Sequence, residues 1–187
     1  MSAAREKLLA AYARLGNLRA ACAETGAAPY VAYIWCRKAG VLKADDKSRY
    51  GSQAQRRGAS AEAEFKRLVP AAMPANSALV KNCPGFDFDV DGILVDVKYS
   101  SRNKCGGAWR FFTARHKPLA PDLYVVFFAT DPGGDLADGY RLLLIPHDFV
   151  SDRSVINLQP NSGSELWQLE VQPETLSGLL ATTEAAR

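Results

Sequence analysis

The chain has 187 residues, a formal net charge of +3 and 23% charged residues, which suffices for a small helical module and one sheet domain with its own core. No apolar stretch is long enough to span a bilayer and no signal peptide is evident, so a cytoplasmic protein is expected and a membrane protein is excluded. The four cysteines lack any Cys-x-x-Cys spacing, which favours reduced thiols over a zinc site.

The first residues, 1–44, predict a domain of three short helices separated by tight turns. Each helix has a residue suited to its start and a glycine suited to its end, in the pairs Ser2 and Gly16, Asn17 and Gly26, and Pro29 and Gly40. A small core at helical spacing is expected from Leu8, Leu9, Tyr12, Leu15, Leu18, Ala21, Cys22, Val31, Ile34 and Trp35.

This segment resembles the helix-turn-helix of transposases and phage regulators, through residues 18–26 and 28–39. In that motif the last helix enters the major groove of DNA. We therefore expect DNA contacts from Tyr30, Tyr33, Arg37 and Lys38, with the alternative that either tyrosine packs against the second domain. Residues 1–57 carry eleven Lys or Arg against four Asp or Glu, a balance that attracts phosphate, whereas residues 58–187 carry twelve against sixteen.

A polar linker is expected over residues 45–56, before an alanine-rich helix that begins near Arg57. Apolar residues at helical spacing, Ala61, Phe65, Leu68 and Val69, predict this helix, and Ser60 could cap its start. Glu62 lies near its beginning, where a helix followed by a meander can bring it over the polar face of the hairpin that follows.

That hairpin is predicted by strict alternation of apolar residues on both sides of Asp91-Gly92, a favoured two-residue turn. The turn sets Val90 opposite Ile93, Phe88 opposite Val95 and Asp87 opposite Asp96. Asp87, Asp96 and Lys98 then share the polar face.

Opposed carboxylates in an antiparallel pair lie about 5 Å apart and repel each other. A hard divalent cation such as Mg²⁺ would compensate them, although an acidic hairpin can also simply keep a sheet edge soluble. Asp89 also points to the polar face and is the rival of Asp87.

The residues after the hairpin predict a basic groove and then a sheet scaffold. No acidic residue occurs between Val97 and Asp122, and the basic residues there include Arg102, Lys104 and Arg110. They are expected to line a DNA groove, with a solvated loop as the alternative. Trp109 is expected in the core or as a wedge against a base or sugar. A central strand is predicted over residues 122–129, further strands over 140–145 and 166–171, and a C-terminal helix or tail over 173–187.

The order Gly58-x-x-x-Glu62-x-x-Phe65, then Asp87, then Asp96-x-Lys98, resembles the PD-(D/E)XK nuclease superfamily of restriction enzymes, Holliday junction resolvases and some homing endonucleases. The resemblance covers residues 57–130. It departs from the pattern in one place, because Phe86 and not proline precedes Asp87.

The resemblance implies a restriction-endonuclease-like α/β domain over residues 57–172, with a central mixed sheet flanked by helices. It implies hydrolysis of DNA phosphodiester bonds with Mg²⁺, for which Mn²⁺ can substitute. Asp87 and Asp96 would hold the metal, Glu62 would support a ligand or water, and Lys98 would orient water or neutralise charge.

The resulting hypothesis is a homodimeric endonuclease of homing or mobile-element, restriction or repair, or junction-resolving type, in the host-cell cytoplasm if it is phage-encoded. The alternative is a non-catalytic helix-turn-helix regulator that retains a nuclease fold.

Overall fold

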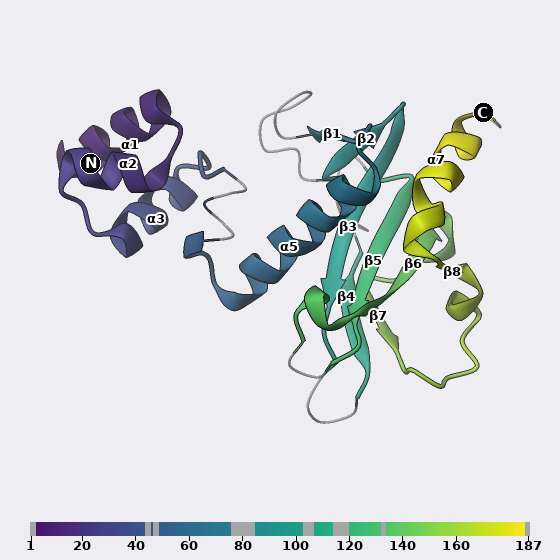
Figure 1. The fold of residues 1–187 in the computed structure, drawn as a ribbon. Helices are drawn as coiled ribbons and strands as arrows, with labels where there is room; N and C mark the ends of the chain where they lie inside the picture. Colours follow the sequence, from purple (N-terminus) through teal and green to yellow (C-terminus); the bar gives the residue numbers. More distant parts are fainter. Residues whose placement is uncertain are drawn as a thin grey trace. The chain divides into compact units, whose positions relative to one another are not determined.

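The computed structural model describes residues 3–43, 46, 49–75, 85–102, 107–113, 120–131 and 134–185, with side chains to residue 182. The chain divides into two compact units, Met1–Ala59 and Ser60–Arg187 (Figure 1). Among the described residues, no helix is both long and apolar enough to cross a membrane. The predicted fold class, a three-helix N-terminal unit followed by a mixed sheet with flanking helices, is confirmed.

The N-terminal unit contains α1 (Ala3–Leu15), α2 (Leu18–Thr25) and α3 (Pro29–Lys38). The side chain of Asn17 accepts a hydrogen bond from the Ala20 main-chain nitrogen at 3.0 Å and caps α2, as predicted. Gly26, with φ of 72°, ends the same helix in the left-handed conformation that glycine adopts without strain.

The buried side of α3 differs from the prediction. Ala32, Tyr33 and Cys36 are buried, whereas Val31 is exposed and Ile34 and Trp35 are only partly buried. Small side chains at 32 and 36 allow the helices to approach closely, so the helix turns these residues inward and the larger ones outward. The surface expected for DNA contact is rotated accordingly.

The long helix α5 (Gln53–Leu68) starts earlier than expected, within the residues predicted as linker. Ser52 and Gln55 form a reciprocal cap: Gln55 N donates to Ser52 Oγ at 3.3 Å and Ser52 N donates to Gln55 Oε1 at 3.0 Å. Ser60 therefore lies inside the helix and does not cap it, which corrects the prediction. The boundary between the two units also falls within α5.

These two serines give a direct test of the helix start. We expect Ser52→Ala to lower the free energy of unfolding by about 1 kcal/mol, because an N-cap oxygen is lost. Ser60→Ala is the matched control and should be neutral or slightly stabilising, since alanine is the better helix former. Urea denaturation followed by circular dichroism measures both. A larger loss for Ser60→Ala would contradict this assignment.

The second unit is built on a six-stranded sheet with the order β1-β2-β3-β5-β6-β8. β3 and β5 are parallel and the other neighbours are antiparallel, so the sheet is mixed. The strands are β1 (Met73–Pro74), β2 (Phe88–Val90), β3 (Ile93–Ser100), β5 (Leu123–Ala129), β6 (Tyr140–Pro146) and β8 (Glu170–Val171). The edge strand expected over residues 166–171 is largely the 3₁₀ helix Glu165–Leu169, and only its last two residues pair.

The predicted hairpin is confirmed in turn and register. Phe88 pairs with Val95, Asp89 with Leu94 and Val90 with Ile93. Asp91 and Gly92 both have positive φ, at 50° and 86°, as the expected two-residue turn requires.

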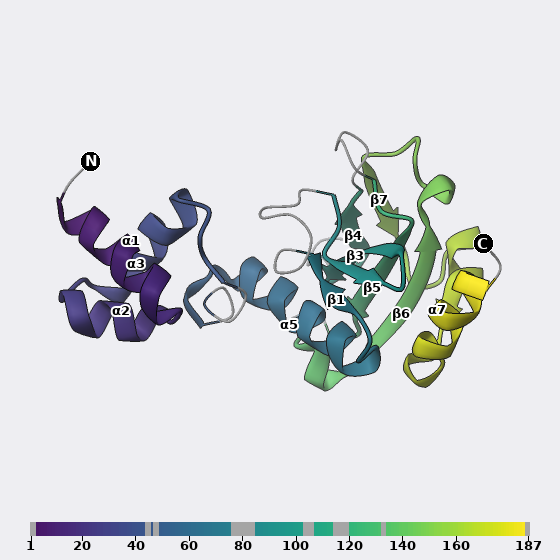
Figure 2. The same cartoon turned by 90° about the horizontal axis from the view of Figure 1, so that it is seen from above.

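The two faces of the sheet carry different layers (Figure 2). Ala61 and Phe65 of α5 and Leu176 and Leu180 of α7 (Leu176–Ala185) pack on the face that contains Val95. The small antiparallel sheet of β4 (Trp109–Phe112) and β7 (Val155–Leu158) covers the other face. β5 is buried along its whole length because both layers cover it, as predicted for a central strand.

Candidate active site

A row of polar side chains follows one side of β3. Val95 and Val97 belong to the core under α5, so the alternating residues Asp96, Lys98 and Ser100 point to the opposite face, which β4 and β7 partly cover. The same face carries Tyr124 and Val126 of β5 beside Asp96 and Lys98.

Asp87, the residue before β2, lies beside this row. Its main-chain nitrogen donates to Val95 O at 2.9 Å, and its Oδ2 accepts from the Val97 nitrogen at 2.9 Å. The Asp87 carboxylate thus takes the place of a main-chain oxygen in the hydrogen bonding between β2 and β3, which holds the carboxylate beside β3. This contact brings Asp87 close enough to Asp96 for the two charges to interact.

Asp96 is the most unusual group of the site. It is 3% exposed, and within the described part of the chain its Oδ2 has no hydrogen-bond partner. Its Oδ1 accepts a hydrogen bond from Lys98 Nζ at 2.6 Å. A buried carboxylate oxygen without a donor is costly, which makes this oxygen a candidate ligand for a cation.

The surroundings of Asp96 disfavour its charged form. Burial raises the pKa of Asp96 most. The Lys98 ammonium lowers it and the negative charge of Asp87 raises it further, so that the pKa lies at about 7. Asp96 therefore shifts between its protonated and ionised forms near neutral pH, a behaviour common in catalytic sites.

The other predicted acids lie elsewhere. Ala61 and Phe65 place α5 on the apolar face of the hairpin, not over its polar face as expected, and Glu62 is half-buried on that helix. Asp89 accepts from the Gly92 nitrogen at 2.8 Å and so stabilises the turn. Among the described residues, no three His, Cys, Asp or Glu side chains cluster closely enough to bind one metal, so Glu62 does not join Asp87 and Asp96 in such a cluster.

The fold has a relative among solved structures. No protein-family model and no curated protein matches this chain. The chain is similar to the structure of a bacterial homing endonuclease, I-Ssp6803I, with a TM-score of 0.50 and 17% sequence identity over 73% of this chain and 99% of that chain. The two proteins share a fold.

The predicted DNA-contacting residues of α3 separate into two groups. Tyr30 is 72% exposed, and Arg37 and Lys38 are exposed near the end of the helix. Tyr33 is 4% exposed, and its hydroxyl donates to Gln55 Oε1 at 2.6 Å. Tyr33 therefore belongs to the core of the N-terminal unit, because its hydroxyl finds a partner at the start of α5, and its predicted DNA contact is wrong.

The basic residues after β3 lie beside the polar row. Arg110 is anchored to Ser100, since Ser100 Oγ accepts from the Arg110 nitrogen at 2.8 Å and donates to its carbonyl at 2.9 Å. Arg102 Nε donates to Gly107 O at 3.0 Å, and its guanidinium lies over the Trp109 ring. Trp109 itself is buried, so it is core and not a wedge. Lys104 lies outside the described residues.

β7 and the polar side chains next to it were not predicted from the sequence. Ile156 and Leu158 alternate with Asn157 and Gln159, a short period-two pattern that could have revealed the strand. Ser100 was missed as well, although it stands two residues after Lys98 on the same face.

Proposed function

We propose that this protein is a Mg²⁺-dependent DNA endonuclease. Asp87, Asp96 and Lys98 would form the active site that hydrolyses the phosphodiester bond. The observation that carries the proposal is the buried Asp96 carboxylate, with a second carboxylate beside it. One of its oxygens accepts from Lys98, and the other has no hydrogen-bond partner among the residues that the structure describes. The shared fold with a homing endonuclease supports the same class of reaction.

The donor set suits a hard divalent cation. Asp87 and Asp96 supply oxygen ligands, and Mg²⁺ commonly takes one or two carboxylates together with water and phosphate oxygens; Mn²⁺ accepts the same ligands. When bound, such a cation supplies charge that stabilises the phosphate in the transition state and activates water as the nucleophile.

The chain's own residues position the substrate and the charges. Lys98 keeps Asp96 oriented through the 2.6 Å contact, and its remaining donors can bind a phosphate oxygen or the attacking water. Glu62 takes no part in this proposal, because α5 packs on the opposite face of the hairpin.

We further propose that the three-helix N-terminal unit targets the enzyme to DNA, with Tyr30, Arg37 and Lys38 exposed on α3 for this purpose. Because one such site cuts one strand, cleavage of both strands favours a homodimer. The site suits homing or mobile-element, restriction or repair, and junction-resolving enzymes alike, and the choice of DNA substrate separates them.

The test is cleavage of supercoiled plasmid, linear duplex and a four-way junction, with Mg²⁺ or with EDTA. We expect cutting only with Mg²⁺, and a loss of about 10²- to 10³-fold in Lys98→Ala, as for removal of one preorganised electrostatic group. The preferred substrate separates a resolvase from a duplex endonuclease. Tight binding without cutting of any substrate would instead favour the non-catalytic regulator.

A further inference from the structure

The two-stranded sheet of β4 and β7 has one buried and one exposed face. Trp109 and Phe111 of β4 and Ile156 and Leu158 of β7 pack on the central sheet. Arg110 and Phe112 therefore point away from it, opposite Asn157 and Val155. We call this pair of strands the β4–β7 ribbon.

The outer face of the β4–β7 ribbon has the chemistry of a surface that reads base edges. Arg110 pairs across the strands with Asn157, and Gln159 follows Asn157 by two residues on the same side of the chain. Neither strand contains an acidic residue. Arginine matches the acceptor pair of guanine, and the amides of asparagine and glutamine match the donor and acceptor of adenine.

An exposed aromatic side chain adds to this face. Phe112 is 59% exposed, and the Arg110 guanidinium lies 5.2 Å from the centre of its ring. The ring restricts the guanidinium at low entropic cost, and it offers an apolar surface of the kind that contacts a thymine methyl group.

The β4–β7 ribbon lies directly beside the row of polar side chains on β3, which comprises Asp96, Lys98 and Ser100. The side-chain hydroxyl of Ser100 accepts from the Arg110 nitrogen and donates to the Arg110 carbonyl, and Ser100 lies two residues from Lys98 on β3. At about 3.3 Å per residue this separation is roughly 7 Å, or about two base steps of B-DNA. Packed sheets lie about 10 Å apart, so the outer face of the ribbon lies a few base steps from a phosphate bound at Lys98.

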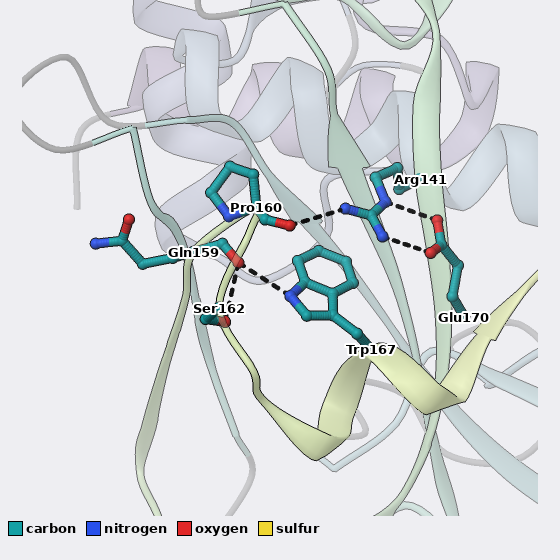
Figure 3. Close-up of polar contacts among 6 residues, drawn as sticks. All are labelled: Arg141, Gln159, Pro160, Ser162, Trp167 and Glu170. Carbon is teal, nitrogen blue, oxygen red and sulfur yellow. Dashed lines mark hydrogen bonds and ion pairs between the residues drawn. The ribbon is translucent and has the colours of Figure 1, made fainter.

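Trp167 and Arg141 hold the turn that follows β7 in place (Figure 3). The indole nitrogen of Trp167 donates to the main-chain oxygen of Gln159 at 2.9 Å, and Arg141 donates to that of Pro160 at 3.4 Å. Arg141 lies 3.6 Å from the Trp167 ring centre and forms a bidentate pair with Glu170.

These bonds use main-chain oxygens of the turn, and the amide of Gln159 points away from them in Figure 3. A shallow hollow lies at the end of the ribbon. Arg102 lines it together with Gln159, Pro160, Asn161 and Ser162 of the turn. A rigid support under polar side chains is what preorganised recognition requires.

We propose that the β4–β7 ribbon enters the major groove of duplex DNA beside the cleavage site and reads base edges through Arg110, Asn157 and Gln159. The major groove admits a two-stranded ribbon, and amides that both donate and accept suit base edges better than phosphates, which only accept. The proposal rests on the nuclease function proposed above and gives it a basis for sequence preference.

The test is a selection of bound duplexes from a pool with a randomised central segment, with the full-length protein in EDTA. Sequencing gives the preferred bases, and Mg²⁺-dependent cutting of the selected duplexes by the wild type locates the scissile bond. In Asn157→Ala we expect the preference at a base a few steps from that bond to fall by roughly 5- to 150-fold, with the other positions unchanged.

The matched control is Gln172→Ala, an exposed amide outside the ribbon, which should return the wild-type preference. Asn157 and Gln159 are exposed as well, and thermal unfolding of each variant checks that the fold is intact. Methylation of guanine N7, a major-groove atom, should also block binding of the wild type at the positions read by the ribbon.

The possible failures are distinguishable. If the wild type cuts duplex DNA but Asn157→Ala and Gln159→Ala return its preferences unchanged, the ribbon proposal is overturned and the nuclease stands. A uniform loss of affinity for all sequences would replace base reading by backbone contact and overturn the proposal as well. If the wild type neither binds nor cuts duplex DNA, the ribbon proposal is overturned, and the nuclease proposal falls with it only if the four-way junction is not cut either.

Discussion

Asp96→Asn should abolish cleavage and at the same time make the protein more stable at pH 8. Loss of cleavage is expected to exceed a thousandfold, because Asn lacks the charge that holds a divalent cation, and a bound cation contributes several kcal/mol to the transition state. The gain in stability comes from the removal of a carboxylate that is buried and lies beside Asp87, and whose Oδ2 has no partner in the described part of the chain.

The sign of the stability change follows from proton linkage. The pKa of Asp96 is about 7 in the folded protein and about 4 in the unfolded chain. Its stabilising contribution is therefore complete below pH 4 and is lost as the pH rises to 7, because only the folded state still binds the proton there. At about 1.4 kcal/mol per pKa unit, the advantage of Asp96→Asn reaches at most about 4 kcal/mol at pH 8 and shrinks toward pH 4.

Urea denaturation without divalent cations, at several values between pH 4 and pH 8, measures this difference, and plasmid cleavage measures the activity. Asp89→Asn is the matched control, since its amide oxygen can still accept from the Gly92 nitrogen at the turn. It should keep both activity and the wild-type pH profile. If Asp96→Asn is less stable than the wild type at pH 8, the Lys98 contact outweighs burial and the physical picture of the site is wrong.

The hairpin shows why part of the site could be predicted from the sequence. Its register depends on neighbouring residues only: the Asp91-Gly92 turn and the alternation on both sides. Asp96 and Lys98 stand on one strand, so their common face follows from the period of two.

The parts that were missed depend on contacts between residues far apart in the chain. The pairing of Trp109 with Leu158 joins two strands between which β5 and β6 intervene in the chain, and no local pattern predicts it. The burial of Asp96 likewise results from that layer and from β5. Tyr33 was assigned to the surface because the inward rotation of α3 is decided by helix packing and by Gln55.

Mg²⁺ should raise the unfolding temperature of the wild type, and the rise should grow as the pH increases through 7. A cation that binds only the folded state stabilises it by mass action, by about 2.7 kcal/mol at a hundredfold excess over the dissociation constant. Below pH 7 the proton on Asp96 competes with the cation, because the pKa of this carboxyl is about 7. Differential scanning fluorimetry at pH 5.5 and pH 8, with Mg²⁺ or Mn²⁺ against EDTA, measures the effect without any DNA.

The same measurement distinguishes Asp87 and Asp96 from Asp89 as the metal ligands. Asp87→Asn should lose most of the Mg²⁺ response, since it removes one of the two adjacent acids and leaves an acceptor for the Val97 nitrogen. Asp89→Asn should retain the response. A response that survives in Asp87→Asn and disappears in Asp89→Asn would move the metal to the turn end of the hairpin, whereas no response in any protein would leave the buried oxygen of Asp96 without the ligand that we propose for it.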